Sequence, residues 1–249
     1  VIAMLATASI GAIWSSSSPD FGIKGALDRF AQIEPKVLFA ADGYFYNGKR
    51  FDSLEKLDGI LKALASIKNV VIISYTGKEV DTSSIQNGIL YDDFLASGSV
   101  LEMTFEQLPF DHPLYIMYSS GTTGLPKSIV HGAGGTIIQH VKELRLHTDL
   151  TRDDTIFYFT TCGWMMWNWL VSSLAVGATI VLYDGSPFYP NSEEMWKMAQ
   201  DLKITVFGTS AKFIAACQST GVRPKEDCNL NKLGAIRSTR SLLLEENYD

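Results

Sequence analysis

The sequence predicts an α/β protein in which parallel sheets are flanked by helices. Short, continuous apolar runs, which indicate buried strands, alternate along the chain with longer segments of helical periodicity. Turn-rich stretches separate these segments, and neither an internal repeat nor a low-complexity tract interrupts them. The 249 residues are 46% hydrophobic and 19% charged. That composition and length suit one large domain or two small ones with a buried core.

The first part of the chain alternates helices and strands around one hairpin. Ile23, Leu27 and Phe30 fall near one face of a helix. The Asn47-Gly48 dipeptide indicates a hairpin turn. In chain order we expect a helix at 1–12, a loop at 14–22, a helix at 22–33, a strand at 37–41, a hairpin at 42–50, a helix at 54–67, a strand at 70–75 and a surface loop at 76–87.

The second part continues the alternation with strands that are apolar throughout. Ser192 stands where a helix N-cap is expected. In chain order we expect a strand at 114–118, a helix at 136–147, a strand at 156–160, a tryptophan-rich helix at 164–176, a strand at 178–183, a helix at 192–203, a strand at 204–207 and a helix at 211–219.

Charge and cysteine content exclude some functions. A net charge of −6 and a pI near 5.2 argue against a nucleic-acid partner. Cys162, Cys217 and Cys228 are not at metal-ligand spacing, which indicates reduced thiols in the cytoplasm (cytosol). The opening apolar run is too short to span a membrane and lacks the basic start of a signal peptide. Because the chain starts without Met, we expect an internal fragment or truncated form.

The stretch YSSGTTGLPKSIVHGAGG, residues 118–135, has the composition of a phosphate-binding loop. A Walker A loop beginning at Gly121 would need glycine at position 126, but Pro126 stands there without an N–H to offer. A P-loop ATPase or kinase is therefore disfavoured. Hydroxyls and converging backbone N–H groups can still bind phosphate, and a lysine adds charge. These groups belong to Ser119, Ser120, Gly121, Thr122, Thr123, Gly124 and Lys127.

The order Ser-Ser-Gly-Thr-Thr-Gly-x-Pro-Lys after a buried strand resembles the phosphate loop of the acyl-adenylate-forming (AMP-binding) enzymes. Ser128 departs from the glycine that usually follows the lysine. The resemblance covers residues 1–239 and implies part of the large N-terminal domain of such an enzyme. Arg240 stands where the family has glycine, so we expect residues 240–249 to form a divergent tail and the C-terminal lid domain to be absent.

Within this family, three segments resemble the acyl-CoA synthetases that activate acetoacetate: IWSSSSPDFG, CGWMMWNW and YDGSPFYP. The resemblance places Trp164, Met165 and Met166 at the acyl pocket, although a Trp/Met helix face can equally be plain core. Gly208 and Thr209 are weaker candidates for the same pocket. His131 follows the phosphate loop and is the nearest histidine for a functional role, whereas the others, His112, His140 and His147, are expected to be surface or satisfied residues.

The resemblance implies ATP, Mg²⁺ and coenzyme A as reactants and metal, with acetoacetate as the acid. The loop residues would hold the β- and γ-phosphates, Thr123 would also approach Mg²⁺, and Thr123 and Lys127 would assist the chemistry. Because we expect the family's C-terminal lid domain to be absent, we expect this chain alone to be inactive. Two alternatives stay open: a synthetase for acetate or propionate, and a non-catalytic, ATP-binding truncated isoform.

Overall fold

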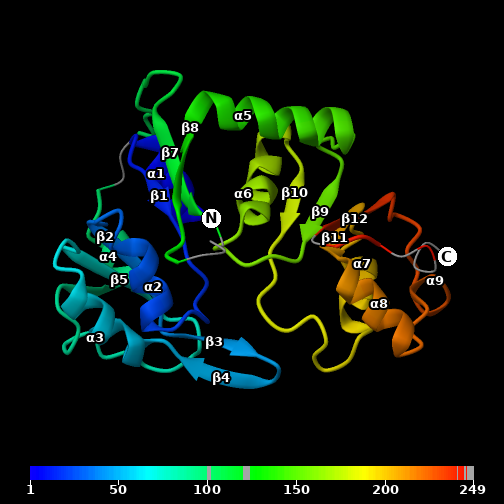
Figure 1. Cartoon of the computed structure of the whole chain (residues 1–249), viewed down its shortest axis with the longest axis horizontal. Coiled ribbons are helices and arrows are strands. Elements are labelled where there is room, and N and C mark those ends of the chain that lie inside the picture. The colour runs from blue at the N-terminus through cyan, green and yellow to red at the C-terminus, as the bar shows by residue number, and fades with distance from the viewer. Residues whose placement is uncertain (100–101, 120–123, 240, 244, 246–249) are drawn as a thin grey trace. The chain divides into compact units, whose positions relative to one another are not determined.

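A computed structural model describes residues 1–99, 102–119, 124–239, 241–243 and 245. The chain divides into two compact units, whose elements are labelled in Figure 1. The first unit contains Val1–Phe45 and Lys49–Gly135, and the second contains Tyr46–Gly48 and Thr136–Asp249. The expected α/β class is confirmed, with parallel sheets and flanking helices in each unit.

The first unit contains a parallel sheet in the order β2-β5-β6. Leu38 and Ala40 of β2 and Val70 and Ile72 of β5 point to one face, where α2 and α3 pack on them. The alternate residue Phe39 points to the opposite face and contacts Phe94 of α4 edge to face. The elements are β2 (Val37–Ala41), β5 (Asn69–Ile73), β6 (Gly88–Leu90), α2 (Ile23–Phe30), α3 (Leu54–Ala63) and α4 (Tyr91–Ala96).

The predicted hairpin is confirmed as β3 (Gly43–Tyr46) and β4 (Lys49–Asp52). Asn47 and Gly48 have φ values of 51° and 72°. Positive φ at both turn positions is what a type I′ turn requires, and Asn followed by Gly supplies it at little steric cost. The local sequence is therefore sufficient to place this turn.

Asp42 joins the ends of three strands in the first unit. Its carboxylate accepts hydrogen bonds from the backbone N–H groups of Tyr75, at 2.8 Å, and Thr76, at 3.0 Å, and from the Thr76 hydroxyl. Its backbone N–H donates to Ile73 at 3.0 Å, and its carbonyl accepts from Ser53 at 3.0 Å. Asp42 is only 1% exposed. The carboxylate thus accepts hydrogen bonds from backbone N–H groups at the point where the chain leaves the sheet after β5.

A second sheet of the first unit has the order β1-β7-β8. It contains β1 (Trp14–Ser15), β7 (Pro113–Tyr118) and β8 (Ser128–Gly132), and α1 (Ile2–Ser9) precedes it. β1 pairs parallel with β7, whereas β8 pairs antiparallel with it. Neither β1 nor β8 was predicted from the sequence. β1 is two residues long and lies inside the serine-rich stretch expected to be a loop, and β8 lies inside the stretch interpreted as a phosphate-binding loop.

The second unit is built on a parallel sheet in the order β10-β9-β11-β12. Its strands are β9 (Thr155–Tyr158), β10 (Thr179–Val181), β11 (Val206–Ser210) and β12 (Ala235–Thr239). Its helices are α5 (Ala133–Lys142, whose first residues belong to the first unit), η1 (Glu143–His147), α6 (Met165–Ser172), η2 (Ser173–Val176), α7 (Glu194–Asp201), α8 (Ala211–Ser219) and α9 (Pro224–Asp227).

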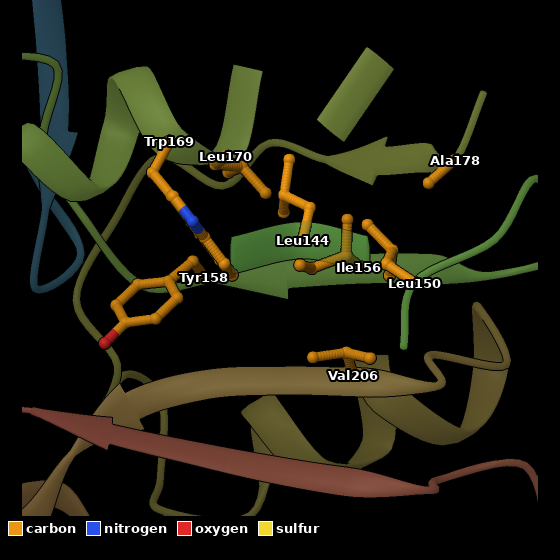
Figure 2. Packing of buried hydrophobic residues seen from close by; sticks show 8 residues of the cluster. All are labelled: Leu144, Leu150, Ile156, Tyr158, Trp169, Leu170, Ala178 and Val206. Carbon is orange, nitrogen blue, oxygen red and sulfur yellow. The ribbon is translucent and has the colours of Figure 1, made fainter. Parts of the chain in front are cut away.

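Side-chain alternation divides the core of the second unit between the two faces of this sheet. Ile156 and Val206 pack with Leu144 and Leu170 on one face, as Figure 2 shows. Their neighbours Phe157 and Phe207 join residues of α7 and α8 on the other. Because both faces are covered, the strands are apolar at consecutive positions rather than at alternate ones.

Some details of the helices in the second unit differ from expectation, including the helix predicted at 164–176, which is α6 followed by the 3-10 turn η2. Ser192 was predicted to cap a helix, but α7 begins after Glu193, which makes no side-chain cap hydrogen bond. The serine that does cap a helix is Ser210, whose side chain accepts from the backbone N–H of Phe213 at the start of α8. The single helix predicted at 136–147 is α5 followed by the π-helical turn η1.

Across the part of the chain that the structure describes, no helix has both the length and the apolar composition needed to cross a lipid bilayer.

We predict that the Asp42 carboxylate makes the protein sensitive to acid. Burial acts to raise the pKa of Asp42, but hydrogen bonds from Thr76 and Tyr75 and the charge of Arg50 outweigh it and lower that pKa. The stabilisation is therefore present above the unfolded-state pKa, near 3.9, and is lost as pH falls through the lower folded-state pKa. Asp42→Asn should lower the free energy of unfolding at pH 7 by about 1–3 kcal/mol.

Urea unfolding at pH 7 and at progressively lower pH measures both effects. The variant should lose less stability on acidification than the wild type, because it lacks the titrating group. Asp111→Asn is the control, since Asp111 is an exposed carboxylate of the same unit. Equal acid sensitivity of Asp42→Asn and wild type would contradict this role.

Candidate functional site

The predicted phosphate loop connects two paired antiparallel strands. Tyr118 at the end of β7 lies opposite Ser128 at the start of β8. The ladder extends one step into the loop, because the Ser119 N–H donates to the Lys127 carbonyl at 3.0 Å. The Lys127 N–H in turn lies 3.4 Å from Ser119 Oγ. The structure therefore brings Ser119 and Lys127 together at the base of the loop.

Gly124 and Lys127 keep the properties that phosphate binding needs. Gly124 has a φ of 118°, a backbone conformation that residues with a side chain rarely adopt. Lys127 is exposed, and among the described residues its ammonium makes no ion pair or hydrogen bond. The candidates Ser120, Gly121, Thr122 and Thr123 lie outside the described residues. Their roles in phosphate and Mg²⁺ binding stay predictions.

The strand that leads into the loop is held by residues that sequence reasoning did not single out. Ser15 Oγ donates to the Ile116 carbonyl at 2.9 Å and lies 3.3 Å from the Tyr118 hydroxyl. The Arg29 guanidinium lies 5.8 Å from the Tyr118 ring centroid and 4.3 Å from that of Phe21. Burial raises the pKa of Tyr118, although the Ser15 hydrogen bond and the Arg29 charge oppose it. Tyr118 is therefore a neutral, fixed phenol at the start of the loop.

The histidines of the first unit are engaged in packing or in hydrogen bonds. The His131 ring, on β8, lies 5.1 Å from the Tyr115 ring of β7. Burial lowers the pKa of His131, so the neutral imidazole predominates at pH 7. His112 Nε2 lies 2.8 Å from the Gly11 carbonyl, which confirms it as a satisfied histidine. A functional role for His131 remains a prediction.

The acyl-pocket candidates all lie in the second unit, at α6 and β11. Trp164 is the N-cap of α6, and Met165 is the first residue of that helix. Met165 is 49% exposed, whereas Met166 packs against the core cluster of Figure 2. Core packing is thus shown for Met166 and not for Met165. Trp169, at 9% exposure, belongs to the core.

Gly208 allows an aromatic ring to lie over strand β11. β11 lies between β9 and β12, and Gly208 pairs with Tyr158 on one side and Arg237 on the other. A Cβ atom at position 208 would overlap the Tyr158 ring. The Tyr158 hydroxyl lies 3.0 Å from Thr239 Oγ1, at the end of β12. Glycine is therefore required here by the close approach of the ring.

Tyr158 connects Gly208 to the helix that carries the methionines. Its ring meets the Trp169 indole edge to face, with centroids 6.0 Å apart, as Figure 2 shows. Met166, Trp169, Tyr158 and Gly208 thus share one face of the sheet. Thr209 is buried, at 3% exposure, and alternation directs its side chain to the other face. The two candidates on β11 therefore lie on opposite faces of the sheet.

The described residues contain no group of three or more His, Cys, Asp or Glu side chains arranged to hold a metal ion.

The motif and fold together define the class of protein. A model of the AMP-binding enzyme family matches residues 1–242, so the chain belongs to that family. Two relatives are acetoacetyl-CoA synthetases. The one from Danio rerio is 52% identical over 255 residues, and the one from Rhizobium meliloti (strain 1021) is 51% identical over 246 residues. These alignments cover 100% and 98% of this chain and 38% of each relative.

A solved structure agrees with this assignment. The acetoacetyl-CoA synthetase from Streptomyces lividans superposes with a TM-score of 0.93 at 43% identity. It covers 99% of this chain, and the chain corresponds to 37% of that protein. The chain therefore spans well under half the length of the relatives that it matches.

We predict that Gly208→Ala destabilises the second unit by about 1–3 kcal/mol, because the added methyl group displaces the Tyr158 ring and breaks its contact with Thr239. Urea unfolding followed by tryptophan fluorescence measures the loss. Gly234→Ala is the matched control, since a Cβ there meets only Thr205 O at an ordinary 3.6 Å. The control should change the free energy of unfolding by less than about 1 kcal/mol. Equal effects of the two substitutions would contradict the requirement for glycine at 208.

Proposed function

We propose that this protein takes part in the ATP-dependent activation of acetoacetate to acetoacetyl-CoA. In the first half-reaction the acid's carboxylate attacks the α-phosphate of ATP, which forms an acyl-adenylate and releases pyrophosphate. In the second, the thiol of coenzyme A attacks the acyl carbon and releases AMP. The observation that carries the proposal is the phosphate loop, held at its base by Ser119 and Lys127 and turned at Gly124.

The loop would act by position and charge. The hydroxyls and N–H groups of 119–124 would hold the β- and γ-phosphates of ATP, and the Lys127 ammonium would offset the charge on departing pyrophosphate. Because Lys127 has no described counter-ion, its charge remains available to a ligand. The pairing of Ser119 with Lys127 supports this role, since it holds the two ends of the loop close together.

The loop also suits a magnesium ion. Hydroxyl oxygens are hard ligands of the kind Mg²⁺ prefers, and Thr123 would hold the ion together with phosphate oxygens. When bound, Mg²⁺ would neutralise part of the triphosphate charge. In this scheme Ser119 and Lys127 orient the phosphates, and Thr123 both contacts the phosphates and holds the ion.

The acid would lie against residues of the second unit. Trp164, Met165 and Met166 would supply an apolar wall, and Gly208 would let the Tyr158 ring pack closely at its edge. The names of the relatives support acetoacetate as the acid. Acetate and propionate are the competing substrates, and a comparison of the three acids distinguishes them.

We place the protein in the cytosol. Cys217 and Cys228 are free thiols, and burial raises the pKa of both. Protonated thiols without disulfides are typical of a reducing compartment.

The decisive experiment is acid-dependent exchange of labelled pyrophosphate into ATP with Mg²⁺ present. We would measure it on this chain and on a chimera in which the chain replaces the matching segment of a full-length relative. We expect exchange with acetoacetate in the chimera and none in the chain alone. Lys127→Ala in the chimera should raise the KM for ATP about tenfold, the loss of one charge-assisted contact. Lys78→Ala, at an exposed lysine of the same unit, is the control.

Each other outcome selects a different function. Exchange that is faster with acetate or propionate would identify a sister synthetase. ATP binding without any exchange in the chimera would indicate a non-catalytic nucleotide-binding module. Exchange by the chain alone would contradict the expectation that it is inactive.

We predict that substitution will distinguish the roles of Met165 and Met166. Met165→Ala should shift the preference between acetoacetate and acetate about tenfold, because an exposed side chain can contact the acid. It should leave the free energy of unfolding within about 0.5 kcal/mol of wild type. Met166→Ala should lower that free energy by about 1–2 kcal/mol, since Met166 packs on the core. Exchange kinetics in the chimera and urea unfolding test this, and the reverse pattern would exclude it.

A further inference from the structure

Gln32 contacts the returning arm of the phosphate loop. Its Nε2 donates to the Pro126 carbonyl at 2.8 Å, and the Ser128 hydroxyl donates to its Oε1 at 2.9 Å. The same nitrogen donates to the Asp28 carbonyl at 2.6 Å, in the last turn of α2. All of these residues belong to the first unit. One side chain therefore ties the loop to a helix that is more than ninety positions away in the sequence.

The partners determine the orientation of this amide. The carbonyl oxygens of Asp28 and Pro126 can only accept, so the NH₂ group must face them. This leaves Oε1 toward Ser128, whose hydroxyl donates. Both N–H donors and one lone pair of the amide are in use. An apolar side chain of the same length could make none of these three hydrogen bonds.

The hydrogen bonds of Gln32 fix the residues on both sides of Lys127 in the chain. Pro126 and Ser128 are its two neighbours in the chain, and both are bound to Gln32. On the other strand, Ser119 is paired with the Lys127 backbone. The backbone of Lys127 is therefore held by Ser119 after β7, and its two chain neighbours are held by Gln32, which follows α2. Only its long side chain keeps rotational freedom, which suits a residue that must present a charge from a defined position.

We propose that Gln32 is a positioning residue of the phosphate loop and that Ser128 is its partner. The proposal rests on the phosphate-binding function proposed above. Gln32 acts through Pro126 and Ser128 and does not itself touch phosphate. It also accounts for the serine that follows the lysine in this chain: glycine at 128 would leave Gln32 Oε1 without this donor.

Hydrogen exchange tests the contact without any ligand. Gln32→Met keeps the length of the side chain but removes all three hydrogen bonds. We expect the amides of Ser119 and Lys127 to exchange about three- to tenfold faster in this variant. Gln107→Met is the matched control, because Gln107 is an exposed glutamine of the same unit whose amide donates to the nearby Phe105 carbonyl. Unchanged exchange in Gln32→Met would overturn the proposal.

Pyrophosphate binding, measured by calorimetry on the same chain, tests the positioning role. Gln32→Met should raise the Kd about three- to tenfold, and Ser128→Ala about two- to threefold. The double variant should be no weaker than Gln32→Met, because both substitutions break one network. Gln107→Met should bind as wild type does. A merely structural role would lower the free energy of unfolding and leave the Kd unchanged.

The outcomes separate this proposal from the function on which it rests. Wild-type binding with equal Kd values in all variants would overturn the positioning role and leave the phosphate function standing. No pyrophosphate binding by the wild type, with faster exchange in Gln32→Met, would overturn the phosphate function and with it the positioning role, while the contact itself would stand.

Discussion

The pairing of β7 with β8 is the constraint on which the candidate phosphate site depends. Antiparallel strands must be joined by a chain that reverses direction, and the register of Tyr118 with Ser128 places that reversal at 119–127. The ladder then continues through Ser119 and Lys127, so the two ends of the loop are tied by backbone hydrogen bonds and not by side chains alone. A shift of one residue would turn every side chain of β8 to the other face.

In the second unit, the parallel sheet imposes a comparable constraint on the acyl-pocket candidates. Strand alternation assigns Gly208 to the face of α6 and Thr209 to the face of α7 and α8. The Tyr158 ring occupies the space over Gly208 and is held between Trp169 and Thr239. Neighbouring residues in the sequence therefore have different surroundings, which a motif match alone does not distinguish.

Much of the fold could be predicted from sequence because its signals are local. The β2 strand at 37–41 and the α8 helix at 211–219 have the predicted bounds, and the Asn47-Gly48 turn follows from backbone sterics. What could not be predicted depends on distant partners. β1 is two residues long and exists only because β7 pairs with it. Gln32 is ordinary in its local sequence, and its contact with Pro126 arises from tertiary packing.

The proline that excludes a Walker A loop also explains how this loop is built. A Walker A loop leads into a helix, whose N-terminal N–H groups add to the phosphate cradle. Here the loop leads into β8, so no helix N-terminus follows it directly. Pro126 contributes no N–H, and its carbonyl accepts a hydrogen bond from the Gln32 amide. In the proposed function the positive charge comes from Lys127, whose backbone is paired with Ser119 and whose two chain neighbours are bound to Gln32.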